Sequence, residues 1–495
     1  MLQVRAKTLS RREVLGAAAG IGGAALFGRA ASAGAWGQLS RKRSGQPRVA
    51  IVGAGLAGLT CAYRLHQGGI AATVYEAHEQ RVGGRCWTAR GFAGGQTAEH
   101  GGEFIDTRHV RIRALARELG LRLQDVAAIA GRSPRLHPRL FLAGELRRFS
   151  KVYAEQHLLR RQADRDRRRI GSFHWLRPTA AARALDETSA EEWLLAAAPG
   201  PGRELLRRAV RQYMAEEYGL DCDRLSAIAM VLEFGSAGFE SDERFHVAGG
   251  NDQIPWGLVE RLPRGAVRLG QPLASLRRHG TGYALGFAGG GAEVRVDVAV
   301  LCLPFTALRR VDLSAAGLGR RRRQCIEQLG MGTNAKLLIQ LRRPPRSYDR
   351  FDGEYFDEQI DSWDSSLGEG GGRGLLTVYS GGRYGAGYPG PAVHGRPPRR
   401  VVDATLARIA RAVPGLAAGF DGDAWLDRWA ADPWTHGSYA AYLPGQYTRF
   451  WGFAGLAEGG LHFGGEHTAT EAQGYLEGAV RSGERCAREV AARLG

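Results

Sequence analysis

Lysine is almost absent from this sequence. Only four of its 68 basic residues are lysines, so arginine carries nearly all of the net charge of +18. These four are Lys7, Lys42, Lys151 and Lys336. The densest basic run, residues 164–169, mixes two aspartates with four arginines, and a second run, 320–323, opens a predicted helix. Both are typical of solvated helix faces, and we therefore expect no nucleic-acid partner.

Cysteine is scarce as well. None of the six cysteines lies in a C-x-x-C spacing, which argues against a zinc or iron–sulfur site. Cys61 and Cys302 lie in apolar runs and are predicted to be buried thiols, while the pattern leaves one disulfide open. The sequence also brings together no Ser-His-Asp arrangement, metal-binding cluster or catalytic pair of carboxylates, so we expect no metal.

Apolar runs long enough to cross a membrane are missing too. Residues 10–15 read Ser-Arg-Arg-Glu-Val-Leu, a twin-arginine pattern, and an apolar, glycine-rich stretch follows at 14–27. Small residues at 31–33 supply a cleavage site. We therefore predict a twin-arginine signal peptide at 1–33, followed by a linker at 34–46. The chain would be exported, folded, by the twin-arginine translocation machinery to a periplasmic or extracellular location.

A β-α-β unit opens the mature chain. The sequence predicts a strand at 48–52, an amphipathic helix at 56–67 and a second strand at 72–75. Gly53, Gly55 and Gly58 form a G-x-G-x-x-G loop, which permits the tight turn, the approach of a pyrophosphate and close packing of helix on strand. Glu76, at the end of the second strand, is placed to bond ribose hydroxyls. The unit predicts a dinucleotide site for an unphosphorylated adenosine ribose.

Two further glycine pairs follow this unit. Gly83 and Gly84 lie beside Arg85, and permissive backbone next to a fork-shaped cation predicts a second cradle for a pyrophosphate. Gly101 and Gly102 then supply backbone that a flat ring can approach. This combination favours FAD over NAD.

With these motifs the chain resembles the flavin monoamine oxidases and L-amino-acid oxidases over nearly its whole mature length. Segments 463–468 and 474–479 are the matching motifs near the C-terminus. The resemblance implies that Gly465 and Glu466 meet the ribitol and pyrophosphate of FAD. It also implies that the helix opening at Leu476 points its N-terminus at the pyrimidine edge of the flavin.

Two more details follow from this resemblance. Segments 249–253 and 271–273 match the family, and the backbone at Leu273 would bracket the adenine. Between Glu76 and Arg81 the chain has one residue more than the commonest family spacing, which leaves the role of His78 open.

Lys336 is a candidate catalytic residue. It lies on an apolar predicted strand within 331–341, where a lysine is costly to bury. A chain that otherwise uses arginine indicates that a compact ammonium is needed here. By resemblance, Lys336 would hold a water against flavin N5 and aid the reaction with dioxygen. The alternative is a lysine that snorkels at a strand edge.

Segment 429–439 resembles the family segment that approaches the benzenoid side of the flavin, beginning at Trp429. Tyr439 and Tyr475 match the two aromatic residues that flank the substrate amine, and are the other candidate catalytic residues. Ser438 stands where the mammalian monoamine oxidases have a flavin-linking cysteine. The resemblance therefore implies non-covalently bound FAD.

These matches imply an FAD-dependent amine oxidase that oxidises a primary or secondary amine to an imine, with dioxygen as acceptor and hydrogen peroxide as product. Amino-acid oxidases of the snake-venom kind bind the substrate carboxylate with an arginine. This chain has Phe104 there and Arg108 four residues on, which favours an amine without a carboxylate. L-amino-acid oxidase is the close alternative. A quinone-dependent flavin desaturase or dehydrogenase and a non-catalytic FAD-binding protein are the others.

The predicted fold is α/β, a two-lobe flavoprotein with a Rossmann-type FAD-binding lobe and a substrate lobe of mixed sheet and helices. The FAD-binding domain would be discontinuous, from 47–125, 240–330 and 430–495, and the substrate domain would comprise 126–239 and 331–429. Glycine-rich loops are expected at 368–374 and 381–390. The sequence leaves open whether the chain forms a homodimer.

Overall fold

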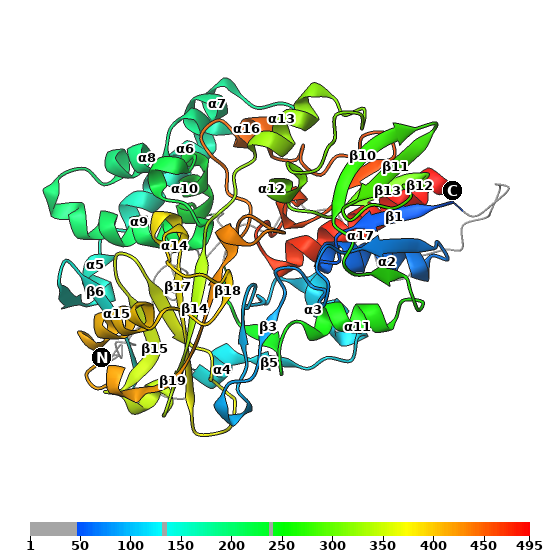
Figure 1. Cartoon of the computed structure of the whole chain (residues 1–495). Helices are drawn as coiled ribbons and strands as arrows, with labels where there is room; N and C mark the ends of the chain where they lie inside the picture. Colours follow the sequence, from blue (N-terminus) through cyan, green and yellow to red (C-terminus); the bar gives the residue numbers. More distant parts are fainter. Residues whose placement is uncertain (1–46, 131–135, 237–240) are drawn as a thin grey trace.

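The computed structural model describes residues 47–130, 136–236 and 241–495. The predicted signal peptide and linker lie outside these residues. The described chain forms two lobes, with β1 and α17 on one side and β14 to β19 on the other (Figure 1). This confirms the predicted two-lobe α/β fold. None of the described helices has the length and apolar character needed to cross a membrane.

A five-stranded parallel sheet forms the centre of the first lobe, in the order β20-β13-β1-β2-β9. Its strands are β1 (Val49–Val52), β2 (Ala72–Tyr75), β9 (Val267–Arg268), β13 (Val298–Leu301) and β20 (Leu461–Phe463). Both faces of β1 are buried, as expected of a parallel strand covered by helices. Helix α2 (Leu56–Gln67) packs against α17 (Leu476–Leu494), so the two ends of the described chain share one core.

Smaller elements complete this lobe. The antiparallel strands β10, β11 and β12 form a separate sheet, and two short pairs, β3-β4 and β5-β8, lie toward the second lobe. The strands are β3 (Thr88–Ala89), β4 (Ala98–Glu99), β5 (Leu123–Asp125), β8 (Phe245–Val247), β10 (Leu273–His279), β11 (Gly282–Phe287) and β12 (Val294–Val296). The helices are α3 (Val110–Glu118), α4 (Val126–Ala130), α11 (Gln253–Glu260), α12 (Phe305–Leu308) and α13 (Arg320–Gln328).

An eight-stranded mixed sheet forms the second lobe, in the order β18-β19-β14-β17-β16-β15-β6-β7. Its strands are β6 (His137–Leu142), β7 (Glu145–Arg147), β14 (Ala335–Leu341), β15 (Phe351–Phe356), β16 (Asp361–Asp364), β17 (Gly374–Ser380), β18 (His394–Gly395) and β19 (Phe420–Arg428). Helices also belong to this part of the molecule: α5 (Phe149–Val152), α6 (His157–Ile170), α7 (Ala180–Glu187), α8 (Ala190–Ala197), α9 (Glu204–Tyr218), α10 (Ala227–Phe234), α14 (Gly382–Ala386), α15 (Arg399–Ala410) and α16 (Tyr447–Phe450).

Strand β14 is buried along its whole length, and its two faces contact different parts of the protein. Leu337 and Ile339 point into an apolar core shared with α15. The alternate residues, Lys336, Leu338 and Gln340, face the β3-β4 hairpin of the first lobe. Because side chains alternate along a strand, one sheet both closes the second core and presents polar groups to the first lobe.

A row of polar residues crosses this sheet on the face toward the first lobe. His394, Asp427, Lys336, Tyr379 and Asp361 are successive cross-strand partners on β18, β19, β14, β17 and β16. Directly paired residues of antiparallel strands lie on the same face. The register of five strands therefore collects these side chains at the boundary between the lobes.

Three sequence expectations need correction. Segment 381–390 contains the short helix α14 rather than loop alone. Asp166, expected on a solvated face, is buried and accepts a hydrogen bond from Trp193 Nε1 at 2.8 Å. Arg322 is only 1% exposed and donates from Nη1 to the carbonyl of Ala454 at 2.7 Å. In both cases a partner inside the protein replaces water, which a pattern of charges along a helix does not reveal.

All six cysteines are free and buried. The expectation of buried thiols at Cys61 and Cys302 is therefore confirmed, and none of the six is paired in a disulfide.

Candidate functional site

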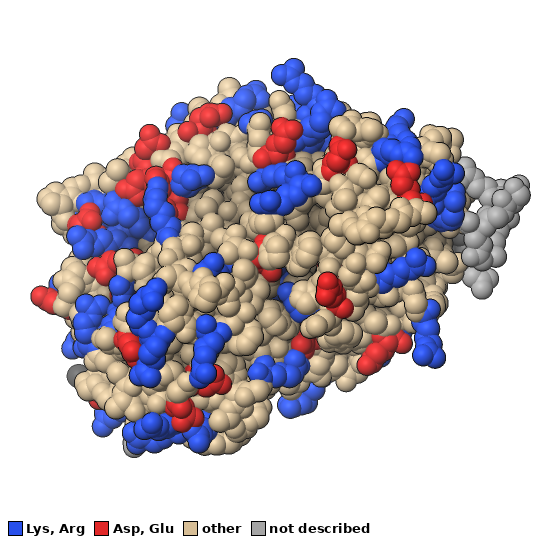
Figure 2. Space-filling view, in the orientation of Figure 1, with Lys and Arg blue, Asp and Glu red and all other residues tan. Residues whose placement is uncertain are grey.

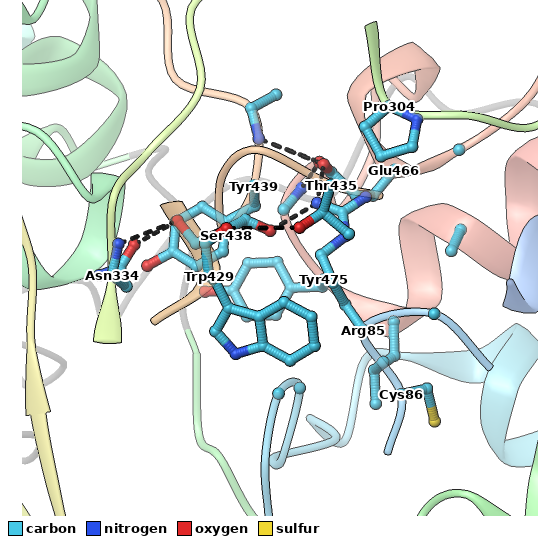
Figure 3. Close-up of a pocket in the computed structure, with 18 of the residues that line it drawn as sticks. Arg85, Cys86, Pro304, Asn334, Trp429, Thr435, Ser438, Tyr439, Glu466 and Tyr475 are labelled. Atoms are coloured by element: carbon cyan, nitrogen blue, oxygen red, sulfur yellow. Dashed lines mark hydrogen bonds and ion pairs between the residues drawn. The ribbon is translucent and has the colours of Figure 1, made fainter. Parts of the chain in front are cut away.

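A cavity of about 510 Å³ lies between the lobes, within the range of roughly 300–1,000 Å³ typical of ligand sites. Every residue predicted for the site lines it except Gly58, which lies behind Gly53. Figure 3 shows part of its wall, where segment 429–439 meets Arg85, Glu466 and Tyr475. The three candidate catalytic residues, Lys336, Tyr439 and Tyr475, thus share one cavity although they come from different parts of the chain.

The first glycine loop has the contacts that its spacing predicts. Gly53 has φ +99°, and a Cβ on Gly58 would lie 1.9 Å from the carbonyl oxygen of Gly53. Gly55 is open, with its nearest neighbour for an added Cβ 3.9 Å away. Helix α2 begins after Gly55 without a side-chain cap, so its first N–H groups are available to an anion in the cavity.

Glu76 lies beside this loop. Its carboxylate accepts hydrogen bonds from the backbone N–H groups of Ala54 at 2.7 Å and His78 at 2.9 Å. Burial raises the pKa of Glu76, although these hydrogen bonds oppose the shift. Leu273 lines the same end of the cavity, after Gln271, whose N–H donates to the carbonyl of Glu76. This end of the cavity therefore combines a polar group, Glu76, with an apolar one, Leu273.

The second cradle is held by an ion pair. Gly83 and Gly84 have φ +97° and +58°, and Arg85 Nη1 lies 2.9 Å from Glu466 Oε1. Glu466 also accepts hydrogen bonds from the N–H groups of Gly474 at 2.9 Å and Ala440 at 3.2 Å. Glu466 therefore connects the C-terminal loop, segment 429–439 and the Arg85 cradle.

Gly101 and Gly102 let their segment pack closely against Arg85 and Leu476. A Cβ on Gly101 would lie 2.0 Å from the carbonyl oxygen of Arg85, and one on Gly102 would lie 2.7 Å from Leu476 Cδ2. Trp429 is buried and donates from Nε1 to the carbonyl of His100 at 2.9 Å. A larger residue at either glycine would force these segments apart.

Lys336 is buried at the lobe boundary, with 4% of its surface exposed. Its Nζ lies 2.7 Å from Glu103 Oε2 and donates to the carbonyl of Glu99 at 3.1 Å. The Nζ also lies 5.2 Å from the centroid of the Trp363 ring. The alternative of a lysine snorkelling to solvent does not fit these contacts, since the ammonium ends in the protein interior.

Tyr439 is connected to Lys336 through Tyr379. Lys336 Nζ lies 6.0 Å from the Tyr379 ring centroid, and the hydroxyls of Tyr379 and Tyr439 are 3.0 Å apart. The Tyr439 hydroxyl donates to the carbonyl of Glu216 at 2.6 Å, and its ring lies beside Gly474, which precedes Tyr475. Burial, followed by the nearby Tyr379 and Glu217, raises the pKa of Tyr439 well above its usual range. It therefore stays a neutral phenol.

Several residues of the cavity and its surroundings escaped the sequence analysis. Glu103 and Tyr379 contact Lys336, and a set of carboxylates lines the cavity away from the glycine loops. This set is Glu216, Glu217, Glu233, Glu243, Glu354 and Asp361. No motif in the sequence pointed to any of them. The carboxylates share no spacing, because they come from helices α9 and α10, the loop before β8, and strands β15 and β16.

Arg108, considered above for a substrate carboxylate, is exposed and does not line the cavity. Phe104 does line it and packs against Trp363, with ring centroids 5.7 Å apart. On the carboxylate side, the lining residues include one arginine, Arg160 of α6. Among the described residues, no group of three or more His, Cys, Asp or Glu is arranged to hold a metal ion.

A buried network of histidines and aspartates supports the cavity wall. His394 bonds Asp427 through Nδ1 at 2.8 Å and Asp432 through Nε2 at 2.9 Å, and His100 Nδ1 bonds the other oxygen of Asp427 at 2.8 Å. His394 also packs on Trp429, with ring centroids 4.8 Å apart. The network thus links the edge of the second sheet to the segment that carries Trp429.

The charge states follow from these contacts. Burial alone would lower the pKa of His394, but its hydrogen bonds to Asp427 and Asp432 outweigh burial and raise it. Burial would raise the pKa of both aspartates, but the histidines lower it. The network is therefore most stable with His394 charged between two carboxylates.

Comparison with known proteins gives concordant matches. A family model described as flavin-containing amine oxidoreductase matches residues 56–491. A Mycobacterium tuberculosis protein provisionally named flavin-containing monoamine oxidase AofH is 28% identical, over 90% of this chain and 97% of its own. The L-amino-acid oxidase of Mus musculus is 25% identical, over 91% of this chain and 72% of its own.

Solved structures share the fold. Wild-type putrescine oxidase bound to putrescine has a TM-score of 0.76 at 24% identity, covering 90% of this chain and 99% of its own. Cyclohexylamine oxidase from Brevibacterium oxydans IH-35A has a TM-score of 0.77 at 22% identity, covering 91% and 100%.

The buried network makes stability depend on pH. Because the pKa of His394 is raised in the folded protein, its contribution is complete below the unfolded value of about 6.5 and is lost as pH rises through the folded value. His394→Gln should therefore destabilise the protein by about 3 kcal/mol near pH 5.5 and by less near pH 9. Denaturant unfolding of both proteins measures the difference. The exposed His66→Gln is the control, and an equal loss at both pH values would contradict the assignment.

Proposed function

Since the chain belongs to the family of flavin-containing amine oxidoreductases, we propose that it is an FAD-dependent amine oxidase. Its substrate would be an amine that carries a positive charge on a second, distal nitrogen and has no carboxylate, and dioxygen would be the electron acceptor. One observation carries this proposal. The cavity that holds the candidate catalytic residues is lined by carboxylates, in a protein whose net charge is +18.

FAD fits the residues present. The uncapped start of α2 and the cradle of Gly83 and Gly84 would hold the pyrophosphate, and Glu76 would bond the adenosine ribose. Glu466 and Leu476 would lie against the flavin end. Attachment would be non-covalent, because Ser438 donates its hydroxyl to Asn334 Oδ1 and offers no thiol at the position where the family resemblance implies a link.

Bound flavin would accept a hydride from the carbon beside the substrate nitrogen and later pass electrons to dioxygen. Tyr439 and Tyr475 would flank the reacting amine with neutral aromatic faces. Burial is the main cause that raises the pKa of Tyr475, as of Tyr439, so neither ring carries a charge that would trap an ammonium. The neutral amine that hydride transfer requires is therefore favoured between the rings.

The second charge of the substrate would lie toward the carboxylates. Glu217 is an electrostatic neighbour of both Tyr439 and Tyr475, and Glu243 and Glu233 also act on Tyr475. Figure 2 shows basic residues spread over one face of the molecule with acidic residues among them, so the outer charge does not account for an acidic cavity. A distal ammonium would gain attraction there, whereas a substrate carboxylate would be repelled.

A matched series of three substrates tests this assignment. We expect peroxide production with 1,4-diaminobutane, at a kcat/KM about tenfold or more above that with butylamine. L-Ornithine, which is the same diamine with an added carboxylate, should be poorest. Glu217→Gln should raise KM for the diamine and leave that for butylamine unchanged. Before the assay, acid precipitation should release the yellow flavin into solution.

Other outcomes identify the alternatives. Preference for L-ornithine would make the protein an amino-acid oxidase and direct attention to Arg160 as the carboxylate partner. Amine-dependent bleaching that only quinones reverse would indicate a dehydrogenase. No bleaching by any donor would indicate a non-catalytic flavin-binding protein.

Lys336 would act in reoxidation, because a cation beside reduced flavin stabilises the negative charge that develops on dioxygen. Lys336→Met should slow reoxidation by dioxygen about tenfold or more in stopped-flow experiments while flavin content stays the same. Lys151→Met is the matched control, since Lys151 is exposed on α5. Equal reoxidation rates in wild type and Lys336→Met would remove Lys336 from this step.

We also propose export by the twin-arginine route, which the sequence of residues 1–33 supports. Expressed with its leader in a bacterium that has this machinery, the wild-type chain should be found in the periplasmic fraction. Arg11→Lys combined with Arg12→Lys should keep it in the cytoplasm. Export of the double variant would contradict the proposal.

A further inference from the structure

We infer that Glu103 is a positioning residue for this reaction: its carboxylate is the counter-ion that keeps Lys336 an ammonium and fixes the Nζ at the lobe boundary. The inference rests on the proposed function, in which Lys336 lies beside the flavin. It adds a residue from the opposite lobe to the reacting centre. It also gives Lys336 a defined charge during reoxidation.

The contact itself is close and enclosed. Lys336 Nζ and Glu103 Oε2 are 2.7 Å apart, and the two residues are 4% and 8% exposed. Solvent therefore screens this pair little. An ammonium in such a place keeps its proton only if a negative group compensates for the lost hydration.

Other acids near Lys336 are engaged elsewhere. Asp427 is the cross-strand partner of Lys336, but its two carboxylate oxygens bond His100 and His394. Glu99 contacts Lys336 through its backbone carbonyl, while its carboxyl group accepts from Thr88 and from the N–H of Asn251. Burial also raises the pKa of Glu99 well above its usual range. Glu103 is the carboxylate that remains for the ammonium.

Glu103 is itself held in place from the second lobe. Its Oε1 accepts from Trp363 Nε1 at 2.9 Å and from the Ser365 hydroxyl at 3.3 Å. Ser365 is in turn 2.6 Å from the hydroxyl of Thr377. One oxygen is thus fixed by neutral donors, and the other faces Lys336. This is the arrangement of a preorganised counter-ion, whose geometry does not depend on the bound substrate.

Tyr379 and His246 are further titratable groups near the pair. Tyr379 lies 6.0 Å from Lys336 Nζ, measured to the ring centroid, and burial raises its pKa, so it stays neutral. His246, whose pKa burial lowers, is an electrostatic neighbour of Glu103 and also stays neutral near pH 7. Neither supplies the charge that Glu103 supplies.

The scarcity of lysine makes this inference directly measurable. With lysine labelled with ¹³C at Cε, the whole chain gives four side-chain signals, and Lys336→Met identifies the one from Lys336. In the holoenzyme, Glu103→Gln should lower the titration midpoint of that signal by about one pH unit or more, which is tenfold weaker proton binding. Glu103→Asp should retain most of the wild-type midpoint. It also serves as the second variant if the glutamine variant does not fold.

Ser365→Ala is the matched control, because it removes a neutral hydrogen bond to the same carboxylate and keeps both charges. It should leave the midpoint unchanged. The reoxidation rate of Glu103→Gln should fall as pH rises across the new midpoint, over a range in which the wild-type rate is constant.

An unchanged Lys336 midpoint in Glu103→Gln would overturn the inference, even if the enzyme oxidises amines as proposed. A lowered midpoint in a protein that oxidises no amine would uphold the ion pair and reject the proposed function. The two ideas therefore fail separately.

Discussion

Buried charge at the lobe boundary must find a partner inside the protein, and this constraint organises the molecule. Lys336 extends from the second sheet and is paired by Glu103 of the first lobe. Asp427 of the same sheet is paired by His100 of the first lobe. An unpaired charge in either place would cost several kcal/mol. These pairs therefore stabilise the relative position of the lobes that also forms the cavity.

The same constraint separates the chemistry of the cavity from that of the surface. Arginines on the surface are hydrated or paired with acids, and they keep the protein strongly cationic. Inside the cavity, carboxylates from several elements surround two neutral tyrosines. The field that a substrate meets is thus set locally, since charges separated by more than a Debye length contribute little.

Local signals in the sequence predicted the first part of the fold closely. The helix Leu56–Gln67 and the strand Ala72–Tyr75 have the predicted bounds, because glycine spacing and apolar periodicity act over a few residues. The resemblance to a family supplied Lys336, Tyr439 and Tyr475. The structure brings them to one cavity, and their catalytic roles stay predictions.

What the sequence did not predict depends on register between distant strands. Tyr379 faces Lys336 because β17 pairs with β14 in one register, and a shift of one residue would turn it to the other face. Glu103 follows Gly101-Gly102 without any motif of its own, and only the packing of the β3-β4 hairpin on the second sheet brings it to Lys336. The prediction that Arg322 and Asp166 face solvent was wrong for the same reason, because segments distant in the sequence bury them.

The choice of lysine at position 336 follows from the acceptors available. Lys336 finds one carboxylate and one carbonyl within hydrogen-bonding distance. A guanidinium has five N–H donors in a fixed plane, and each of them needs an acceptor. Asp427, the cross-strand partner of Lys336, already bonds two histidines. An arginine would therefore leave buried donors without acceptors. In a chain that uses arginine for nearly all of its basic residues, the geometry of this site accounts for the lysine at position 336.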